Sequence, residues 1–278
     1  HIHVSEDLGL LLGYYAAEGF SRKEAGSYYQ TTICTPDAKA RDQIIETFEQ
    51  SFGVEAFEEN EWKVTVSNRI IATVFEEVFE AGTRAETKSI PDCVISSPKP
   101  VVRGFLRGYF SGDGSTSSDR VDIRAHTISN SLAEDLLAAL KRFGISATRY
   151  TESRTIDTGV VAEFYDDSPE FETNVLKITS ENAVRFSERI GFHLDRKEET
   201  LNEVIESTEI RSQRLFGDGG DVLLDEVTDV QYVESEIDHT YCLTVEETHT
   251  LVTNDLFSGQ CDGDEDCVML LMDGLLNF

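Results

Sequence analysis

The chain has little positive charge and few cysteine, proline and methionine residues. Among its 278 residues, 24 are Lys or Arg and 53 are Asp or Glu, which gives a formal net charge of −29. The 5 cysteines are an odd number with no C-x-x-C pair, which argues against a zinc site of that type and against a disulfide framework. No apolar run reaches ~18 residues, and no signal peptide is recognisable. We therefore expect a protein of the reducing cytoplasm with no membrane association.

The rest of the composition is that of a folded protein. Hydrophobic residues make up 40% of the chain and aromatic residues 9%, which is enough for buried cores and unlike an acidic disordered tail. The acidic residues are spread along the whole sequence, a surface style similar to that of proteins from salt-accumulating archaea. In molar salt the Debye length falls to ~3 Å, so self-repulsion of such a surface is largely screened. The acidity therefore does not exclude nucleic-acid binding, although counterion release would contribute little to it at that salt.

One pattern occurs twice, as LLGYYAAEG in residues 11–19 and as LRGYFSGDG in residues 106–114, 95 residues apart. Both copies predict an apolar helix with small residues that would let two helices approach backbone to backbone. These small residues are Gly13, Ala16, Ala17, Gly108, Ser111 and Gly112. Each helix then ends in a carboxylate, Glu18 or Asp113, where the macrodipole disfavours negative charge by ~0.3–1 kcal/mol. An electrostatically unfavourable residue at the same place in both copies indicates a function. The glycine that follows each acid predicts that the helix ends in a left-handed cap.

The repeat extends well beyond these helices. In the first half, residues 5–87, the pattern predicts strands at 27–34 and 62–67 and helices at 37–52 and 69–79. In the second half, residues 100–203, it predicts strands at 121–127 and 175–179 and helices at 131–143 and 181–190. Each half is therefore expected to have the order α-β-β-α-β-β-α, which makes residues 1–205 a duplicated α+β domain.

This repeat resembles the two motifs of LAGLIDADG homing endonucleases. In that family the two helices pack at a pseudo-twofold axis over paired four-stranded sheets that lie on the DNA major groove. The resemblance implies that Glu18 and Asp113 hold divalent metal ions, for which we predict Mg²⁺, and that these ions activate water and stabilise the leaving oxygen of a phosphodiester. It also implies a double-stranded DNA partner that is cut in both strands.

Members of the family carry a basic residue beside each acid. Lys88 follows Glu18 by 70 residues and Lys197 follows Asp113 by 84, in a chain with 8 Lys and 16 Arg. The resemblance implies that these lysines polarise water or neutralise phosphate charge. Two surface lysines, or Arg196 in place of Lys197, are the alternatives.

The sequence changes character after a predicted linker at residues 206–221. In the next segment, residues 222–260, the stretches 222–233 and 240–252 are β-rich. The run HTYCLTVEETHTLVTN resembles the C-terminal splicing block of inteins, whose Hint-type fold is all β and often carries an inserted LAGLIDADG domain. The resemblance implies that His249 donates a proton and that the Cys261 thiolate accepts the acyl group. It also implies that the side-chain amide of Gln260 attacks its own carbonyl and releases the intein.

Three residues depart from the usual intein pattern. Gln260 replaces an asparagine, whose smaller ring closes more readily, and Gly259 replaces a histidine. Cys242 stands where Asp is frequent, either as a thiol that modulates the site or as a buried structural cysteine. We expect slow C-terminal cleavage in which His249 carries more of the acid catalysis. The N-terminal splicing blocks are not recognisable, so we expect an excerpt of a longer translation product that needs the N-terminal intein portion as a partner for splicing.

Residues 261–278 resemble a stretch of the large subunit of archaeal family-D DNA polymerases. The resemblance implies that Asp262 and Asp264 bind catalytic magnesium in the spliced parent, which would act with the polymerase small subunit as a DNA-directed DNA polymerase. Our leading hypothesis is an intein-encoded homing endonuclease that cuts the polymerase gene lacking the intein. The alternative is a cleavage-inactive DNA-binding or structural insert that retains only splicing, because Glu18 replaces the usual Asp and lengthens the acidic arm by one methylene.

Overall fold

The computed structural model describes the following residues: 2–155, 170–210, 215–216, 222–223, 229–232, 243–246, 248–253 and 256–259. The chain divides into two compact units, His1–Leu224 and Asp225–Phe278. Several predicted residues lie outside the described ones, namely Cys242, Gln260, Cys261, Asp262 and Asp264.

The first half of the larger unit follows the predicted order of helices and strands. Its elements are α1 (Glu6–Glu18), β1 (Gly19–Glu24), β2 (Ser27–Cys34), α2 (Ala38–Phe52), β3 (Phe57–Asn60), β4 (Lys63–Val66), α3 (Arg69–Thr73) and the one-turn π-helix η1 (Val74–Val78). The strands form an antiparallel sheet in the order β1-β2-β4-β3. Ser5, Asp37 and Asn68 begin α1, α2 and α3, because their side chains accept hydrogen bonds from N–H groups of the first turn.

The second half repeats this arrangement after a short connection through η2 (Ala85–Thr87) and α4 (Asp92–Ile95). Its elements are α5 (Lys99–Gly112), β5 (Ser115–Thr116), β6 (Asp122–Thr127), α6 (Asn130–Lys141), β7 (Thr148–Thr155), β8 (Glu170–Thr179), α7 (Glu181–Arg189) and α8 (Asp195–Ser207). The sheet order, β5-β6-β8-β7, matches that of the first half strand for strand. The predicted duplicated fold of mixed helices and strands is therefore present.

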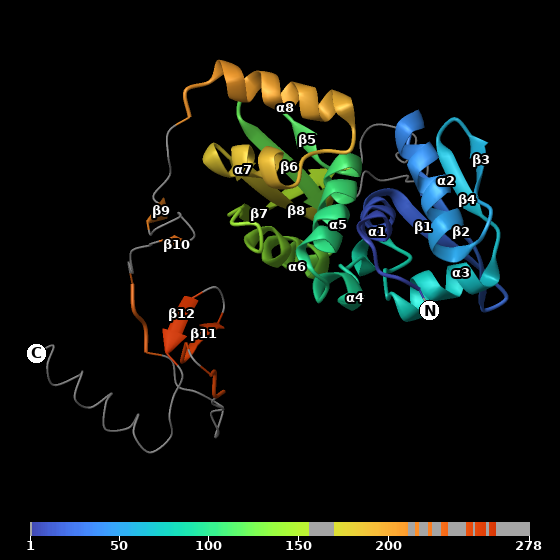
Figure 1. The fold of residues 1–278 in the computed structure, drawn as a ribbon, viewed down its shortest axis with the longest axis horizontal. Helices are drawn as coiled ribbons and strands as arrows, with labels where there is room; N and C mark the ends of the chain where they lie inside the picture. The colour runs from blue at the N-terminus through green and yellow to red at the C-terminus, as the bar shows by residue number, and fades with distance from the viewer. Residues whose placement is uncertain are drawn as a thin grey trace, which may run out of the picture. The chain divides into compact units, whose positions relative to one another are not determined.

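The helices α1 and α5 lie side by side at the centre of the larger unit, with one sheet on each flank (Figure 1). Their backbones touch at glycines. A Cβ added at Gly13 would lie 2.1 Å from the carbonyl oxygen of Phe105, and one added at Gly108 would lie 2.2 Å from that of Leu10. Neither position has room for a side chain, so the predicted close approach of the two helices is confirmed.

The glycines that follow the two acids are needed for a reason different from the predicted one. Gly19 is extended, with φ −101° and ψ 155°, and Gly114 does not have a positive φ, so the predicted left-handed caps are wrong. A Cβ at Gly19 would lie 2.3 Å from Cδ2 of Tyr15, and a Cβ at Gly114 would lie 2.3 Å from the carbonyl oxygen of Phe110. The chain thus turns back against the last helical turn so closely that a side chain would collide with it.

The predicted helix at residues 69–79 is divided into two parts. The α-helix α3 ends at Thr73, and in η1 the N–H of Phe79 donates to the carbonyl oxygen of Val74, five residues earlier, at 2.8 Å. The wider turn carries Phe75, which is fully buried against α1. A π-turn within a helical segment often lies at a functional site.

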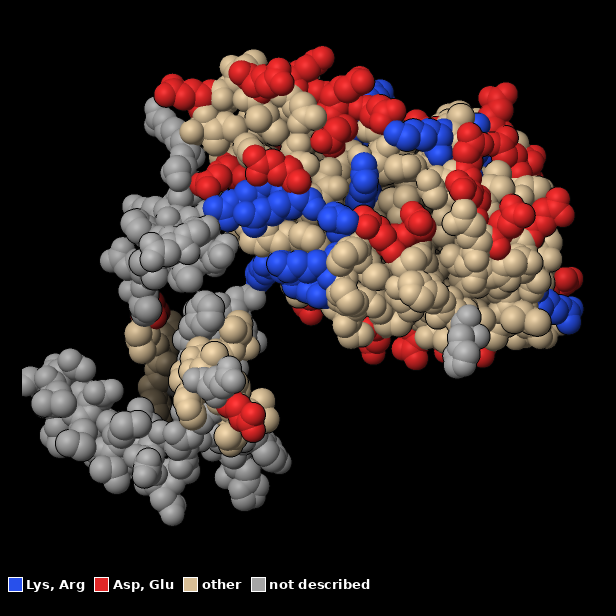
Figure 2. Space-filling view, in the orientation of Figure 1, with Lys and Arg blue, Asp and Glu red and all other residues tan. Residues whose placement is uncertain are grey.

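The described residues after α8 form two short hairpins, one in each unit. In the larger unit β9 (Leu215–Phe216) pairs with β10 (Val222–Leu223), and in the smaller unit β11 (Thr250–Thr253) pairs with β12 (Leu256–Gly259). Residues 229–232 and 243–246, which we expected to be β-rich, are not in strands. Within the described part of the chain, none of the helices has the length and apolar character to span a bilayer. Acidic side chains are spread over the visible face of the larger unit, whereas Lys and Arg gather in a few groups (Figure 2).

Candidate active site

The two repeated acids lie where the central helices end. Glu18 is the last residue of α1, and Asp113 directly follows α5. Ala17 lies against Gly112, where an added Cβ would be 2.5 Å from the Cβ of Ala17, so the two helix ends are in contact. The side chain of Glu18 reaches the surface, whereas Asp113 is half-buried. The helix contact therefore brings one carboxylate from each half to one place.

Lys88 reaches the end of α1 from the connection between the halves. Only 4% of this residue is exposed. Its Nζ donates to the carbonyl oxygen of Tyr15 at 2.9 Å and lies 3.6 Å from the centroid of the Tyr15 ring. The same carbonyl oxygen also accepts the N–H of Gly19, so Lys88 is a second donor to it at the end of α1.

Lys197 has the same relation to α5, although it comes from a different kind of element. It lies near the start of α8. Its Nζ, with three N–H donors, lies within hydrogen-bonding distance of four carbonyl oxygens, those of Phe110 (3.4 Å), Ser111 (2.6 Å), Gly112 (3.0 Å) and Gly114. Tyr15 and Phe110 each stand three residues before the acid of their half, so both lysines meet the same turn of equivalent helices. Arg196, the alternative cation, is exposed.

The four charged groups shift one another's pKa values. Burial raises the pKa of Asp113 to about 8; the Glu18 carboxylate adds to this shift, and Lys197 and Lys88 oppose it. Burial also raises the pKa of Glu18, against the charge of Lys197. Burial lowers the pKa of Lys88 to about 7 and that of Lys197 to about 8. Such opposed shifts in neighbouring acids and bases are typical of catalytic sites.

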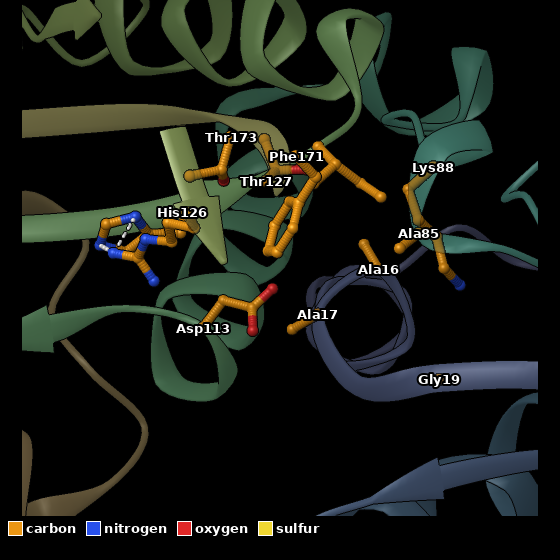
Figure 3. A pocket seen from close by; sticks show the side chains of 12 residues that line it. Ala16, Ala17, Gly19, Ala85, Lys88, Asp113, His126, Thr127, Phe171 and Thr173 are labelled. Carbon is orange, nitrogen blue, oxygen red and sulfur yellow. Dashed lines mark hydrogen bonds between the residues drawn. The ribbon is translucent and has the colours of Figure 1, made fainter. Parts of the chain in front are cut away.

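A cavity of about 330 Å³ opens beside the two helix ends. Figure 3 shows Asp113 facing this space together with side chains of the second sheet, while Lys88 lies beside α1. The lining residues that the sequence interpretation missed are Ala85, His126, Thr127, Ile128, Arg154, Phe171 and Thr173. Arg154 and Phe171 are register partners on β7 and β8, and Arg154 also contacts the His126 ring at 3.0 Å. Strand alternation could have placed His126, but the partnership of Arg154 with Phe171 depends on a pairing that no local pattern encodes.

The paired carboxylates fit a hard divalent cation. Both offer only oxygen donors, and two acids brought together with partial burial repel each other unless a proton or a cation lies between them. Within the described residues, no cluster of three or more His, Cys, Asp or Glu side chains is arranged to hold a metal ion.

Of the predicted splicing residues, His249 is described. It directly precedes β11 and has a positive φ of 50°. In the hairpin of β11 and β12, Thr250 pairs with Gly259, the last residue of β12. His249 directly precedes Thr250 in the sequence. Gln260, its predicted substrate residue, follows Gly259 in the sequence.

Two protein families match different parts of the chain. The LAGLIDADG-like domain family matches residues 100–191, which cover α5 from its second residue onward and most of the second half. The catalytic domain of the DNA polymerase II large subunit DP2 matches residues 258–278.

Two curated relatives match nearly the whole chain, including the regions that the two families match separately. A DNA polymerase II large subunit of Haloquadratum walsbyi is 35% identical over 100% of this chain, and one of Thermococcus kodakarensis is 32% identical over 96% of it. A third, of Halobacterium salinarum, is 73% identical over 24% of it. The chain spans 13%, 15% and 5% of these relatives, so it corresponds to a small part of each.

The chain therefore contains a LAGLIDADG-like domain. More narrowly, it belongs to the inteins with such a domain that are carried within DNA polymerase II large subunits. Among solved structures, it is similar to the homing endonuclease I-DmoI in complex with DNA and Mn, with 16% identity, a TM-score of 0.48, and coverage of 69% of this chain and 100% of that one. It is also similar to full-length DUF199/WhiA, with 16% identity, a TM-score of 0.46, and coverage of 76% of this chain and 63% of that one.

Proposed function

We propose that residues 1–205 are a site-specific DNA endonuclease that makes a metal-dependent double-strand cut. One observation carries the proposal: each half brings one carboxylate and one lysine to the end of its central helix, and the two ends touch. This arrangement provides two related sets of charges for two antiparallel DNA strands. The substrate we propose is double-stranded DNA of the polymerase gene without the intein.

Each charged residue has a defined role in this reaction. Glu18 and Asp113 would hold the divalent cations, for which we propose Mg²⁺ and which would supply Lewis-acid stabilisation of the scissile phosphate. Lys88 and Lys197 lie close enough to the acids to shift their pKa values, so their charges can neutralise phosphate or orient the attacking water. Because burial makes both ammonium groups easier to deprotonate, either lysine can also accept a proton near neutral pH.

The second sheet supplies side chains for DNA binding. Arg154 lies on β7 and contacts Glu152 at 3.6 Å. Exposed ion pairs of this kind contribute little to stability, so a phosphate can replace the carboxylate. Tyr150 on β7 and Phe171 on the neighbouring strand β8 are each 36% exposed and offer apolar surface.

A plasmid that carries the uninterrupted polymerase-gene junction tests this proposal. With magnesium in high salt, we expect the wild-type chain to linearise the plasmid and Asp113→Asn to lower the rate at least ~100-fold, since the substitution removes a ligand charge without changing the size of the side chain. Asp42→Asn, an exposed position on α2, makes the same chemical change elsewhere and should cut like the wild type. DNA binding without any cutting by the wild type would instead support the inactive-insert alternative.

We also propose that residues 222–260 act in C-terminal cleavage of an intein. The position of His249 next to the pair Thr250 and Gly259 supports its role as proton donor at the bond between Gln260 and Cys261. Asp262 and Asp264 would bind magnesium in the spliced polymerase, in which the small subunit is a further partner.

A precursor in which the N-terminal splicing blocks are joined to this chain tests the splicing proposal. The wild type should yield ligated polymerase and released intein, whereas His249→Ala should accumulate branched or unspliced protein on denaturing gels. Equal yields of ligated product from both precursors would remove His249 from the mechanism. The endonuclease assay is independent of this result.

A further inference from the structure

The two halves hold their lysines by different means. In the second half the Lys197 ammonium lies among backbone carbonyl oxygens. In the first half Lys88 donates to one carbonyl, that of Tyr15, and rests on the Tyr15 ring. The position of the Lys88 ammonium group therefore depends on the position of the Tyr15 ring. The position of Lys197 depends instead on backbone carbonyl groups and not on the Phe110 ring.

The ring of Tyr15 is fixed at its hydroxyl end. The Tyr15 hydroxyl donates to a carboxylate oxygen of Glu76 and lies 2.9 Å from Oγ of Ser21, which in turn is 3.3 Å from Oγ1 of Thr31. Tyr15 is fully buried and Glu76 half-buried. A hydrogen bond to a carboxylate under partial burial is stronger than one between neutral groups.

The equivalent position of the second half shows what is special about the first. Tyr15 meets Phe75 edge to face with centroids 4.9 Å apart and an interplanar angle of 70°, and Phe110 meets Phe186 at 5.0 Å and 69°. The ring pairs are thus the same in both halves. Phe110, however, has no hydroxyl group, so it cannot make the bond that anchors Tyr15.

The backbone accounts for the rest of the difference. Glu76 follows Phe75 in the π-helix η1, whereas Ser187 follows Phe186 in the regular helix α7 and bonds instead to Asn202 at 2.7 Å. The wider π-turn therefore coincides with the carboxylate that reaches the tyrosine. The negative charge of Glu76 also favours the ammonium form of Lys88.

We propose that Glu76 is a positioning residue that acts through the Tyr15 hydroxyl to hold Lys88 at the helix end, so that one DNA strand depends on this pair and the other does not. The inference rests on the proposed endonuclease function. The Tyr15 hydroxyl and the Glu76 carboxylate position the lysine of the first half, whereas backbone carbonyl groups position Lys197 in the second half.

Strand-resolved cleavage tests the proposal. With a duplex labelled on both strands, Tyr15→Phe and Glu76→Gln should each slow the cut of the same strand by about tenfold and leave the rate of the other unchanged, so that nicked plasmid accumulates. The double variant should be no slower than either single variant, because both remove one interaction. Equal slowing of both strands by the single variants would overturn the proposal, since a general loss of stability acts on both cuts.

A matched control comes from the neighbouring tyrosine. Tyr14→Phe removes an equally buried hydroxyl from the same helix, one that lies 2.8 Å from Nδ1 of His193. It should not slow the strand that Tyr15→Phe slows. If it slows that strand to the same extent, the effect does not belong to the Glu76 pair and the proposal fails.

A second measurement does not require cutting. The Tyr15 ring should shift the resonances of the Lys88 side chain upfield in proton–carbon spectra, and Tyr15→Phe and Glu76→Gln should both reduce that shift. An unchanged Lys88 resonance in both variants would overturn the positioning role even if the enzyme cuts. A reduced shift in a protein that binds DNA without cutting would instead locate the failure in the proposed function.

Discussion

In the first half of the larger unit, the central helix ends in Glu18, and its lysine lies on a tyrosine ring that a carboxylate holds in place. In the second half, the central helix is followed by Asp113, and its lysine lies among carbonyl oxygens. Both arrangements place one ammonium group at the same turn of the helix. The same electrostatic result is therefore reached through different side chains.

The two halves differ much less where their helices meet. An added Cβ at Gly13 or Gly108 would come within 2.1 or 2.2 Å of a carbonyl oxygen of the opposite helix. Since backbone touches backbone there, a change in one copy cannot be absorbed by a neighbouring side chain. At the helix ends each residue has its own neighbours, so one half can change without the other. The comparison indicates which substitutions should act alike in the two halves and which should not.

The largest effect is expected at the symmetric contact. Gly13→Ala and Gly108→Ala should each lower the free energy of unfolding by about 3 kcal/mol, because the new methyl group must push the helices apart. Gly53→Ala is the matched control: an added Cβ there meets no atom within 4 Å, and the change costs about 1 kcal/mol through its positive φ. Denaturant unfolding in high salt measures all three. A clear difference between the two helix variants would show that the interface is not symmetric.

A smaller effect is expected from exchanging the acids. Glu18→Asp gives the first half the acid of the second and should lower the rate of DNA cutting about tenfold, because the carboxylate withdraws by one methylene from the position that its own half has set. The rate on plasmid DNA with magnesium measures this effect, and circular dichroism checks the fold. If Glu18→Asp cuts at or above the wild-type rate, the longer glutamate arm is not adapted to the first half, and Asp serves at least as well there.

The sequence predicted those parts of the site that repeat. Two copies of one local pattern indicated both helices and their contact. The family resemblance, which implies a basic residue beside each acid, led to Lys88 and Lys197, and the structure brings both to the helix ends. The fold followed for the same reason, because each half shows its order of helices and strands separately.

The sequence did not predict how each lysine is held. The partner of Lys88 is the carbonyl group of Tyr15, 73 residues earlier in the chain, and the bond from Tyr15 to Glu76 joins residues 61 apart. Backbone carbonyl groups are present at every residue, so no sequence pattern marks the ones that bind a cation. The left-handed caps were predicted wrongly for a related reason. Glycine is required at residue 19 by the nearby ring of Tyr15, and a crowded glycine looks the same in a sequence as one that needs a positive φ.

The smallest effect concerns a bond between the two halves, from Tyr14 in α1 to His193 in the loop that leads to α8. Burial, together with the charges of Lys39 and Arg107, lowers the pKa of His193 to about 4 from its usual 6.5. The unfolded chain therefore binds more protons between these values, and the contribution of neutral His193 to stability is complete above pH ~6.5 and is lost as the pH falls towards 4. Between pH 6.5 and 4 the free energy of unfolding should fall by about 1 kcal/mol less in His193→Asn than in the wild type, allowing for solvent that reaches part of the ring. Unfolding curves of both proteins at pH 4, 5, 6 and 7 in equal salt measure it, and parallel stability profiles would show that His193 is not held in its neutral form.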